Sequence, residues 1–182
     1  MIPLRSTITK KLLTYFYLNP QESLYLNEIA RKLRVDKRNL VKKINELEQE
    51  GFFSQQQRGN LKLYTLNSHY PLYEEYKKII LKTVGIEDKL KSIIQEIPNL
   101  QEIYIYGSYA DDTMQAYSDI DLLAIGEHDI ILLQKKLNQL QKDIGREINI
   151  VNMDEKEFKN RIKRNDPFIS GILNKKHIKI SK

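Results

Sequence analysis

Two short apolar runs, the first followed directly by a glycine-serine pair, constrain this fold more than any other sequence feature. The runs IYIY and IDLLAI have the length and composition of buried strands. Gly107-Ser108 follows the first run directly, and a glycine there lets the backbone turn tightly. Segments of helical periodicity at 132–144 and 155–164 alternate with further strand-like runs. The C-terminal part is therefore expected to form a small α/β unit.

Polar side chains with a chemical use stand at the ends of these two runs. Asp119 and Asp121 are two residues apart at the start of the second run, so their carboxylates project from one face of the strand. Ten residues separate Ser108 from Asp119, and at Ser108 a hydroxyl and exposed N–H groups near a helix N-terminus can bind phosphate. Magnesium prefers a few carboxylates together with substrate phosphates. This spacing favours a site for a metal-bound nucleotide.

The whole stretch YIYGSYADDTMQAYSDIDLLAIG resembles the signature of the minimal nucleotidyltransferases, within the polymerase-beta-type nucleotidyltransferase superfamily. The resemblance implies that Gly107 and Ser108 bind the phosphates of an NTP and that Asp119 and Asp121 bind Mg²⁺. Tyr109 and Tyr117 flank the motif and are candidates for stacking on a base. A packing role is the alternative for both tyrosines.

Active members of that family carry a third carboxylate on the next strand, which binds metal and accepts the proton of the attacking hydroxyl. The matching position in REINIVNM is Asn149, which is neutral, cannot act as a general base at pH 7 and is a poorer magnesium ligand. Glu147 is expected on the same face as Asn149 and is a candidate substitute. Its alternative role is a surface charge or a partner of Arg146.

The N-terminal part has a different pattern. Helical periodicity, a short alternating run, two further helical segments and a hairpin with a turn at 58–60 follow one another. Ser6 or Thr7, Asn27 and Asp36 are the expected helix caps, and Gly51 is the expected end of the third helix. The stretch LNEIARKLRVDKRNLVKKINELEQEGFF resembles the winged helix of bacterial transcription regulators.

A recognition helix in a winged helix places its first turns in the major groove of double-stranded DNA. Candidate DNA contacts are Lys37, Arg38, Asn39, Lys42 and Lys43 on that helix and Arg58 and Lys62 on the hairpin. The alternative is that these charges are solvated on a helix that packs only at a protein interface.

The expected fold is a two-domain α+β protein. It has an N-terminal winged helix-turn-helix at 1–70, connecting helices at 71–98, and a nucleotidyltransferase-like α/β domain with a mixed sheet at 99–182. Residues 1–84 hold 15 basic and 8 acidic residues, a net charge of +7, whereas 85–182 has a net charge of −1. The basic excess lies in the part expected to bind DNA. The first connecting helix either pairs with its copy in a homodimer or packs on its own domain.

Composition excludes several classes of protein. The chain has no cysteine, which excludes disulfides, thiolate metal sites and cysteine nucleophiles and fits a reducing cytoplasm. No apolar run approaches the roughly 18 residues of a membrane span. A cytoplasmic protein without a membrane partner is expected.

Three functions fit these patterns. The first is a DNA-binding transcriptional regulator whose nucleotidyltransferase-fold domain binds Mg-NTP. The second is an active nucleotidyltransferase that moves an NMP to a hydroxyl of a protein or RNA, as antitoxin members of the minimal family do. The third is a non-catalytic interaction module. Asn149 favours the first function over the second.

Overall fold

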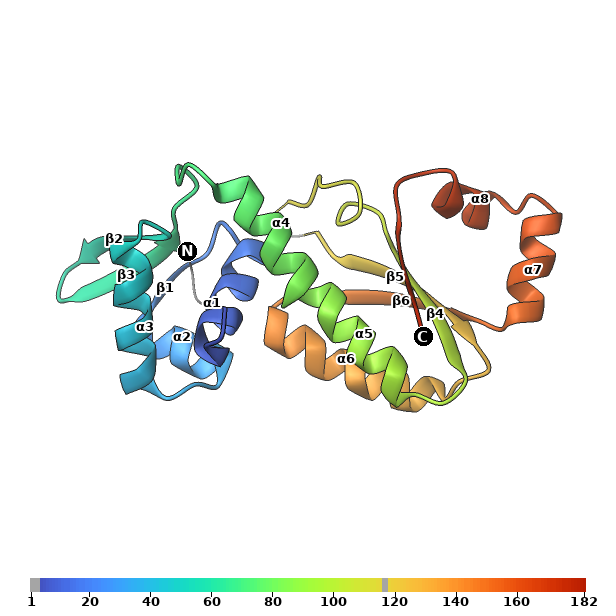
Figure 1. Ribbon diagram of the computed structural model, residues 1–182, viewed down its shortest axis with the longest axis horizontal. Helices are drawn as coiled ribbons and strands as arrows, with labels where there is room; N and C mark the ends of the chain where they lie inside the picture. Colours follow the sequence, from blue (N-terminus) through green and yellow to red (C-terminus); the bar gives the residue numbers. More distant parts are fainter. Residues whose placement is uncertain (1–3, 116–117) are drawn as a thin grey trace. The chain divides into compact units, whose positions relative to one another are not determined.

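The computed structural model describes residues 4–115 and 118–182 of the chain and divides into two compact units. The N-terminal unit runs to Ile86 and includes 142–145; the C-terminal unit comprises 87–141 and 146–182. The boundary falls where helix α4 (Tyr73–Thr83) is followed by α5 (Ile86–Glu96) (Figure 1). The two helices expected to connect the domains therefore belong almost entirely to different units.

Helices and a three-stranded sheet form the N-terminal unit. Its elements besides α4 are α1 (Thr7–Leu18), β1 (Ser23–Tyr25), α2 (Leu26–Leu33), α3 (Lys37–Gln49), β2 (Phe53–Arg58) and β3 (Leu61–Leu66). The antiparallel strands lie in the order β1-β3-β2. Leu12, Phe16, Leu40, Ile44 and Phe53 are buried in its core. This packing leaves the opposite side of α3 exposed to solvent.

Helix ends in this unit follow the sequence with one exception. Ser6 accepts a hydrogen bond from the N–H of Thr9, and Asp36 accepts one from the N–H of Asn39. The expectation that Asn27 caps α2 is wrong, because the helix begins at Leu26. The carboxylate of Glu28 accepts a hydrogen bond from the backbone N–H of Tyr25 at 2.9 Å, which moves the cap to Tyr25.

A mixed four-stranded sheet forms the centre of the C-terminal unit, as the sequence predicted. The elements after α5 are β4 (Leu100–Tyr106), β5 (Ile120–Gly126), α6 (Ile130–Ile144), β6 (Ile148–Met153), α7 (Glu155–Lys163), α8 (Pro167–Leu173) and β7 (Ile178–Ser181). The strand order is β6-β5-β4-β7, and β5 with β6 is the parallel pair.

The two faces of this sheet bury different residues. Ile103, Ile105 and Leu122 are fully buried on one face, along which α5 and α6 run (Figure 1). The other face is covered by α7 and α8, with a core of Tyr104, Leu123, Ile125, Met153, Phe158, Ile169 and Ile172. Strand register continues this second face past the core. It places Tyr106 opposite Asp121, and Asp121 beside Asn149.

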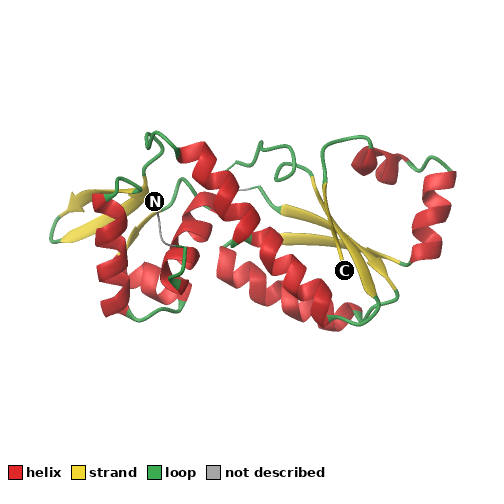
Figure 2. Ribbon diagram, in the orientation of Figure 1, coloured by secondary structure: helices red, strands yellow, loops and turns green. Residues whose placement is uncertain are grey.

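The segment after β4 differs from the sequence prediction. Ser108 was expected near a helix N-terminus, but the described residues between β4 and β5 form turns and loop (Figure 2). The N–H of Asp111 donates to the carbonyl of Gly107 at 3.0 Å, which closes a single turn. Asp112 then has a φ of 58°, which ends the helical direction of the chain.

No helix among residues 4–115 and 118–182 is both long and apolar enough to cross a membrane.

Candidate active site

Gly107 and Asp121 meet at the end of the β4–β5 pair. Gly107 has a φ of +69°, a conformation that L side chains rarely adopt. A Cβ at this position would lie 2.6 Å from Oδ2 of Asp121, which is closer than any van der Waals contact. The glycine is thus required by the backbone turn and also by the space that the Asp121 carboxylate occupies.

Asp119, Asp121 and Asn149 form a polar cluster on the sheet face that α7 and α8 cover. Nδ2 of Asn149 donates to Oδ2 of Asp119 at 3.2 Å and to Oδ1 of Asp121 at 3.3 Å. The parallel register of β5 and β6 causes this meeting, because it sets Asn149 directly beside Asp121. The neutral amide joins the two carboxylates without adding charge. Three residues singled out from the sequence are therefore in contact.

Glu147 does not join this cluster. It lies one residue before strand β6, which begins at Ile148. Its carbonyl accepts a hydrogen bond from the N–H of Ile120 at 2.9 Å, and its side chain is exposed. Among residues 4–115 and 118–182, no three acidic or histidine side chains gather to hold a metal ion. The structure thus offers two carboxylates and one amide at this position.

Tyr109 is buried rather than open to a ligand. Tyr109 is 6 % exposed, and its hydroxyl is buried without a hydrogen-bond partner in the described part of the chain. Burial raises the pKa of this hydroxyl well above its ordinary value. Tyr109 therefore packs inside the unit, which corrects the expectation that it binds the nucleotide. Tyr117 lies outside the described residues.

Arg146 supports the loop that carries the first aspartate, a role that the sequence did not suggest. Its side chain is 6 % exposed, and Nη1 donates to the carbonyls of Gln115 at 3.0 Å and Ser118 at 3.1 Å. Ser118 immediately precedes Asp119. A buried arginine that holds two loop carbonyls restricts where the Asp119 carboxylate lies. No sequence signal separates such an arginine from an exposed one.

Tyr106 completes the row of side chains across the sheet. It is half-buried at the end of β4, opposite Asp121. Burial, followed by the nearby carboxylate of Asp121, raises the pKa of the Tyr106 hydroxyl. The hydroxyl therefore stays protonated at neutral pH and can donate a hydrogen bond.

The candidate DNA contacts lie in the N-terminal unit. Six of them are exposed: Lys37, Arg38, Asn39 and Lys42 on α3 and Arg58 and Lys62 on the β2–β3 hairpin. Lys43 is half-buried and forms an ion pair with Glu46 at 2.5 Å. Its charge is thus partly neutralised within α3.

Comparisons with known proteins concern the C-terminal unit. A family model described as a nucleotidyltransferase domain matches residues 87–179. No curated protein matches the chain.

Two solved structures are similar to part of the chain. A toxin–antitoxin structure with AMP-PNP is 21 % identical, covers 47 % of this chain and 81 % of its own, and has a TM-score of 0.34. A mutant of the toxin–antitoxin pair MntA-HpeT is 18 % identical, covers 52 % of this chain and 71 % of its own, and has a TM-score of 0.39.

The family match spans the two strands, the glycine-serine turn, both aspartates and the helices that cover them. It extends over slightly more than half of the 182 residues. The chain therefore belongs to the nucleotidyltransferase domain family.

Proposed function

We propose that the C-terminal unit transfers a nucleoside monophosphate from an NTP to a hydroxyl group of a protein or RNA acceptor. The hydrogen bonds that join Asp119 and Asp121 through Asn149, with Gly107 beside Asp121 in a nucleotidyltransferase domain, carry this proposal. The enzymatic alternative is thus preferred to the DNA-binding regulator, which the sequence favoured first.

The donor set fits Mg²⁺. Two carboxylates converge on one amide within 3.3 Å, and magnesium is commonly bound by one or two carboxylates together with substrate phosphates. Asp119 and Asp121 would hold the ion, which neutralises phosphate charge when bound. Gly107 and Ser108, in the turn beside Asp121, would contact the phosphates through backbone N–H groups and the serine hydroxyl. In the transfer, the acceptor oxygen bonds to the α-phosphorus, the bond to the β-phosphate oxygen breaks, and pyrophosphate leaves.

The proton of the acceptor hydroxyl needs a base, and Asn149 cannot supply one. Glu147 has the right chemistry but is exposed outside the carboxylate pair. Asn149 would therefore orient the carboxylates of Asp119 and Asp121 through its two hydrogen bonds. Glu147 is the candidate base only if the segment before β6 moves toward Asp119.

The test is incubation of the full chain with each radiolabelled NTP, Mg²⁺ and a cell extract as acceptor. Wild type is expected to label an acceptor, and Asp121→Ala is expected to abolish the label. Glu127→Ala is the matched control, since Glu127 is an exposed carboxylate just after β5. Absence of label with all four NTPs, or equal labelling by Asp121→Ala, would contradict the proposal.

A second proposal concerns the N-terminal unit, which we infer to be a winged helix that binds double-stranded DNA. The exposed basic residues in the first turns of α3 support it, because a recognition helix reads DNA with these turns. Affinity should fall with salt, with a slope of about −0.9 per phosphate neutralised. Arg38→Ala should weaken binding in a salt titration, whereas Lys78→Ala, an exposed charge on α4, should not.

The homodimer remains a prediction. Leu72 and Ile79, before and within α4, are 48 % and 45 % exposed, an apolar pair that a second copy could cover. Sedimentation of wild type and of Ile79→Lys at several concentrations tests it; a monomeric wild type at all concentrations would refute it.

A further inference from the structure

A cavity opens directly beside Gly107, on the sheet face of the two aspartates. Its volume is about 300 Å³, within the range typical of small-molecule sites. Gly107 and Tyr106 form one wall, and α8 forms the other with Phe168, Gly171 and Ile172. The cavity is thus continuous with the turn that is proposed to bind phosphates.

An aromatic ring faces this cavity from α8. Phe168 is 38 % exposed, and its ring makes an edge-to-face contact with Tyr106, with ring centroids 5.9 Å apart. The side chains around it are largely apolar, namely Pro167 and Ile172 with the bare backbone of Gly171. A partly exposed phenylalanine between apolar neighbours offers a flat surface on which another ring can stack.

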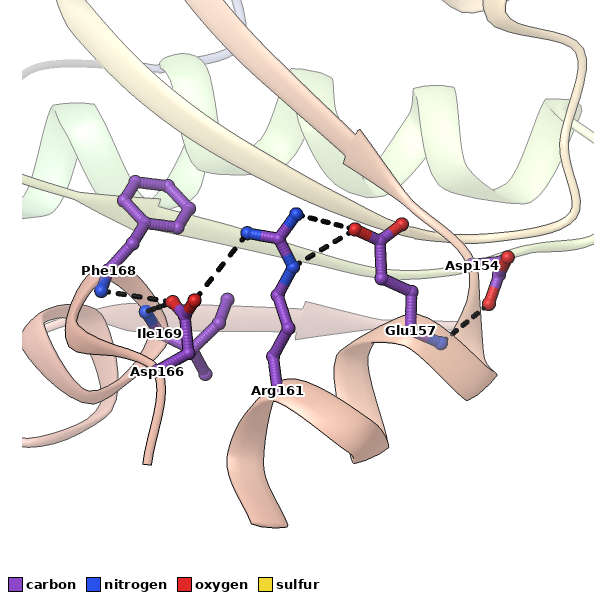
Figure 3. A network of polar contacts seen from close by, with 6 residues as sticks. All are labelled: Asp154, Glu157, Arg161, Asp166, Phe168 and Ile169. Atoms are coloured by element: carbon purple, nitrogen blue, oxygen red, sulfur yellow. Dashed lines mark hydrogen bonds and ion pairs between the residues drawn. The ribbon is translucent and has the colours of Figure 1, made fainter. Parts of the chain in front are cut away.

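A network of polar contacts that runs from α7 to α8 caps the first turn of α8, which carries Phe168 (Figure 3). Oδ1 of Asp166 accepts hydrogen bonds from the N–H groups of Phe168 and Ile169 at 3.0 and 3.1 Å. Arg161 reaches the other oxygen of Asp166 at 3.8 Å and donates to Glu157 at 2.6 and 2.9 Å. These contacts hold the first turn of α8, which forms one wall of the cavity.

Charge at the rim distinguishes between two parts of a nucleotide. Lys176 forms an ion pair with Asp112, and the remaining rim charges are Lys175 and Asp111, which have opposite signs. The rim is therefore close to neutral. A triphosphate carries several negative charges and would need an excess of cations, whereas a nucleobase is neutral, flat and polar at its edges. The cavity fits the base better than the phosphates.

We propose that this cavity binds the nucleobase of the NTP, with Phe168 as its stacking platform. The inference rests on the proposed transferase function and adds the position of the base to it. Tyr109, one of the two tyrosines that the sequence suggested for stacking, is buried, whereas Phe168 is exposed to the cavity. Asp111 and Lys175 lie where they can meet the polar edge of a base.

Gly171 provides a variant that fills the cavity without crowding the fold. A Cβ added to Gly171 would meet no heavy atom within 4 Å, and its φ lies outside the left-handed region. Gly171→Leu should therefore occupy the space of the base. Gly171→Ala is the matched control, because it adds one methyl group and leaves most of the cavity open.

The experiment is calorimetric titration of the full chain in Mg²⁺ with whichever of ATP, GTP, CTP and UTP binds wild type most tightly, and with inorganic tripolyphosphate. Phe168→Ala and Gly171→Leu should weaken NTP binding about 5- to 150-fold, the range for loss of one base stack, and leave tripolyphosphate affinity unchanged. Phe168→Trp and Gly171→Ala should bind like wild type. Ile162→Ala controls for loss of an exposed apolar side chain outside the cavity.

Unchanged NTP affinity in both Phe168→Ala and Gly171→Leu would overturn this inference and leave the transferase proposal intact. Parallel loss of NTP and tripolyphosphate affinity would also overturn it, because the cavity would then hold phosphates. A wild-type chain that binds no NTP would overturn both proposals.

Discussion

Replacing Asn149 by aspartate tests the electrostatics of the carboxylate cluster. The substitution removes the amide that donates at 3.2 and 3.3 Å to Asp119 and Asp121 and places a third negative charge at similar distances. Two unit charges at that separation repel by about 1 kcal/mol in the dielectric of water. All three side chains are half-buried or exposed, so the dielectric of water applies here rather than the lower dielectric of a protein interior. Without divalent cations, N149D should therefore reduce the free energy of unfolding by about 2–3 kcal/mol at low salt.

Magnesium should reverse this loss. A bound ion stabilises the folded state in proportion to its affinity, by about 2.7 kcal/mol at a concentration of 100 Kd. Urea unfolding in EDTA and in MgCl₂ measures both effects. N149D should gain more from Mg²⁺ than wild type, and it should also transfer NMP faster, since a restored general base contributes about 10²- to 10⁴-fold.

The control for this prediction is Asn160→Asp, the same change at an exposed position of α7. Equal stability of N149D and N160D in EDTA would refute the electrostatic argument. An equal gain from Mg²⁺ in N149D, N160D and wild type would place the metal elsewhere.

Four further predictions concern single glycine, arginine and tyrosine residues. Gly107→Ala should lower the free energy of unfolding by more than Gly59→Ala, as measured by urea unfolding of both variants. Both glycines have positive φ, which costs an L residue about 1–2 kcal/mol, but only at Gly107 would the added Cβ meet a carboxylate. Arg146→Met should cost about 2–4 kcal/mol and speed hydrogen exchange in the loop before Asp119, because two carbonyls lose a charged donor; unchanged exchange would contradict its anchoring role. Tyr109→Phe should keep or raise stability at neutral pH, since the buried hydroxyl has no partner in the described residues. Burial raises the pKa of the Tyr17 and Tyr109 hydroxyls, so the folded state retains protons that the unfolded chain releases near pH 10. The free energy of unfolding should therefore fall above that pH, and it should fall less steeply in Tyr109→Phe.

Local patterns predicted much of the C-terminal unit. The apolar runs around Gly107-Ser108 became β4 and β5, and the two aspartates share one face because side chains alternate along a strand. The match at Asn149 came from family resemblance, and strand register brought that residue to Asp121. Glu147 was a candidate substitute base or a surface charge, and its side chain is exposed outside the carboxylate pair.

The sequence by itself determined most of the helices and strands and the position at which the glycine must turn, because these depend on neighbours a few positions apart. Tertiary structure decided which aromatic ring is exposed. Tyr109 lies in the motif but is buried, whereas Phe168 is 59 residues further along the chain and lines the cavity beside Gly107. Burial depends on which surfaces pack over a residue, and α8 reaches this part of the sheet only after the chain has folded. The same holds for Arg146, whose two carbonyl partners lie about 30 residues earlier in the chain.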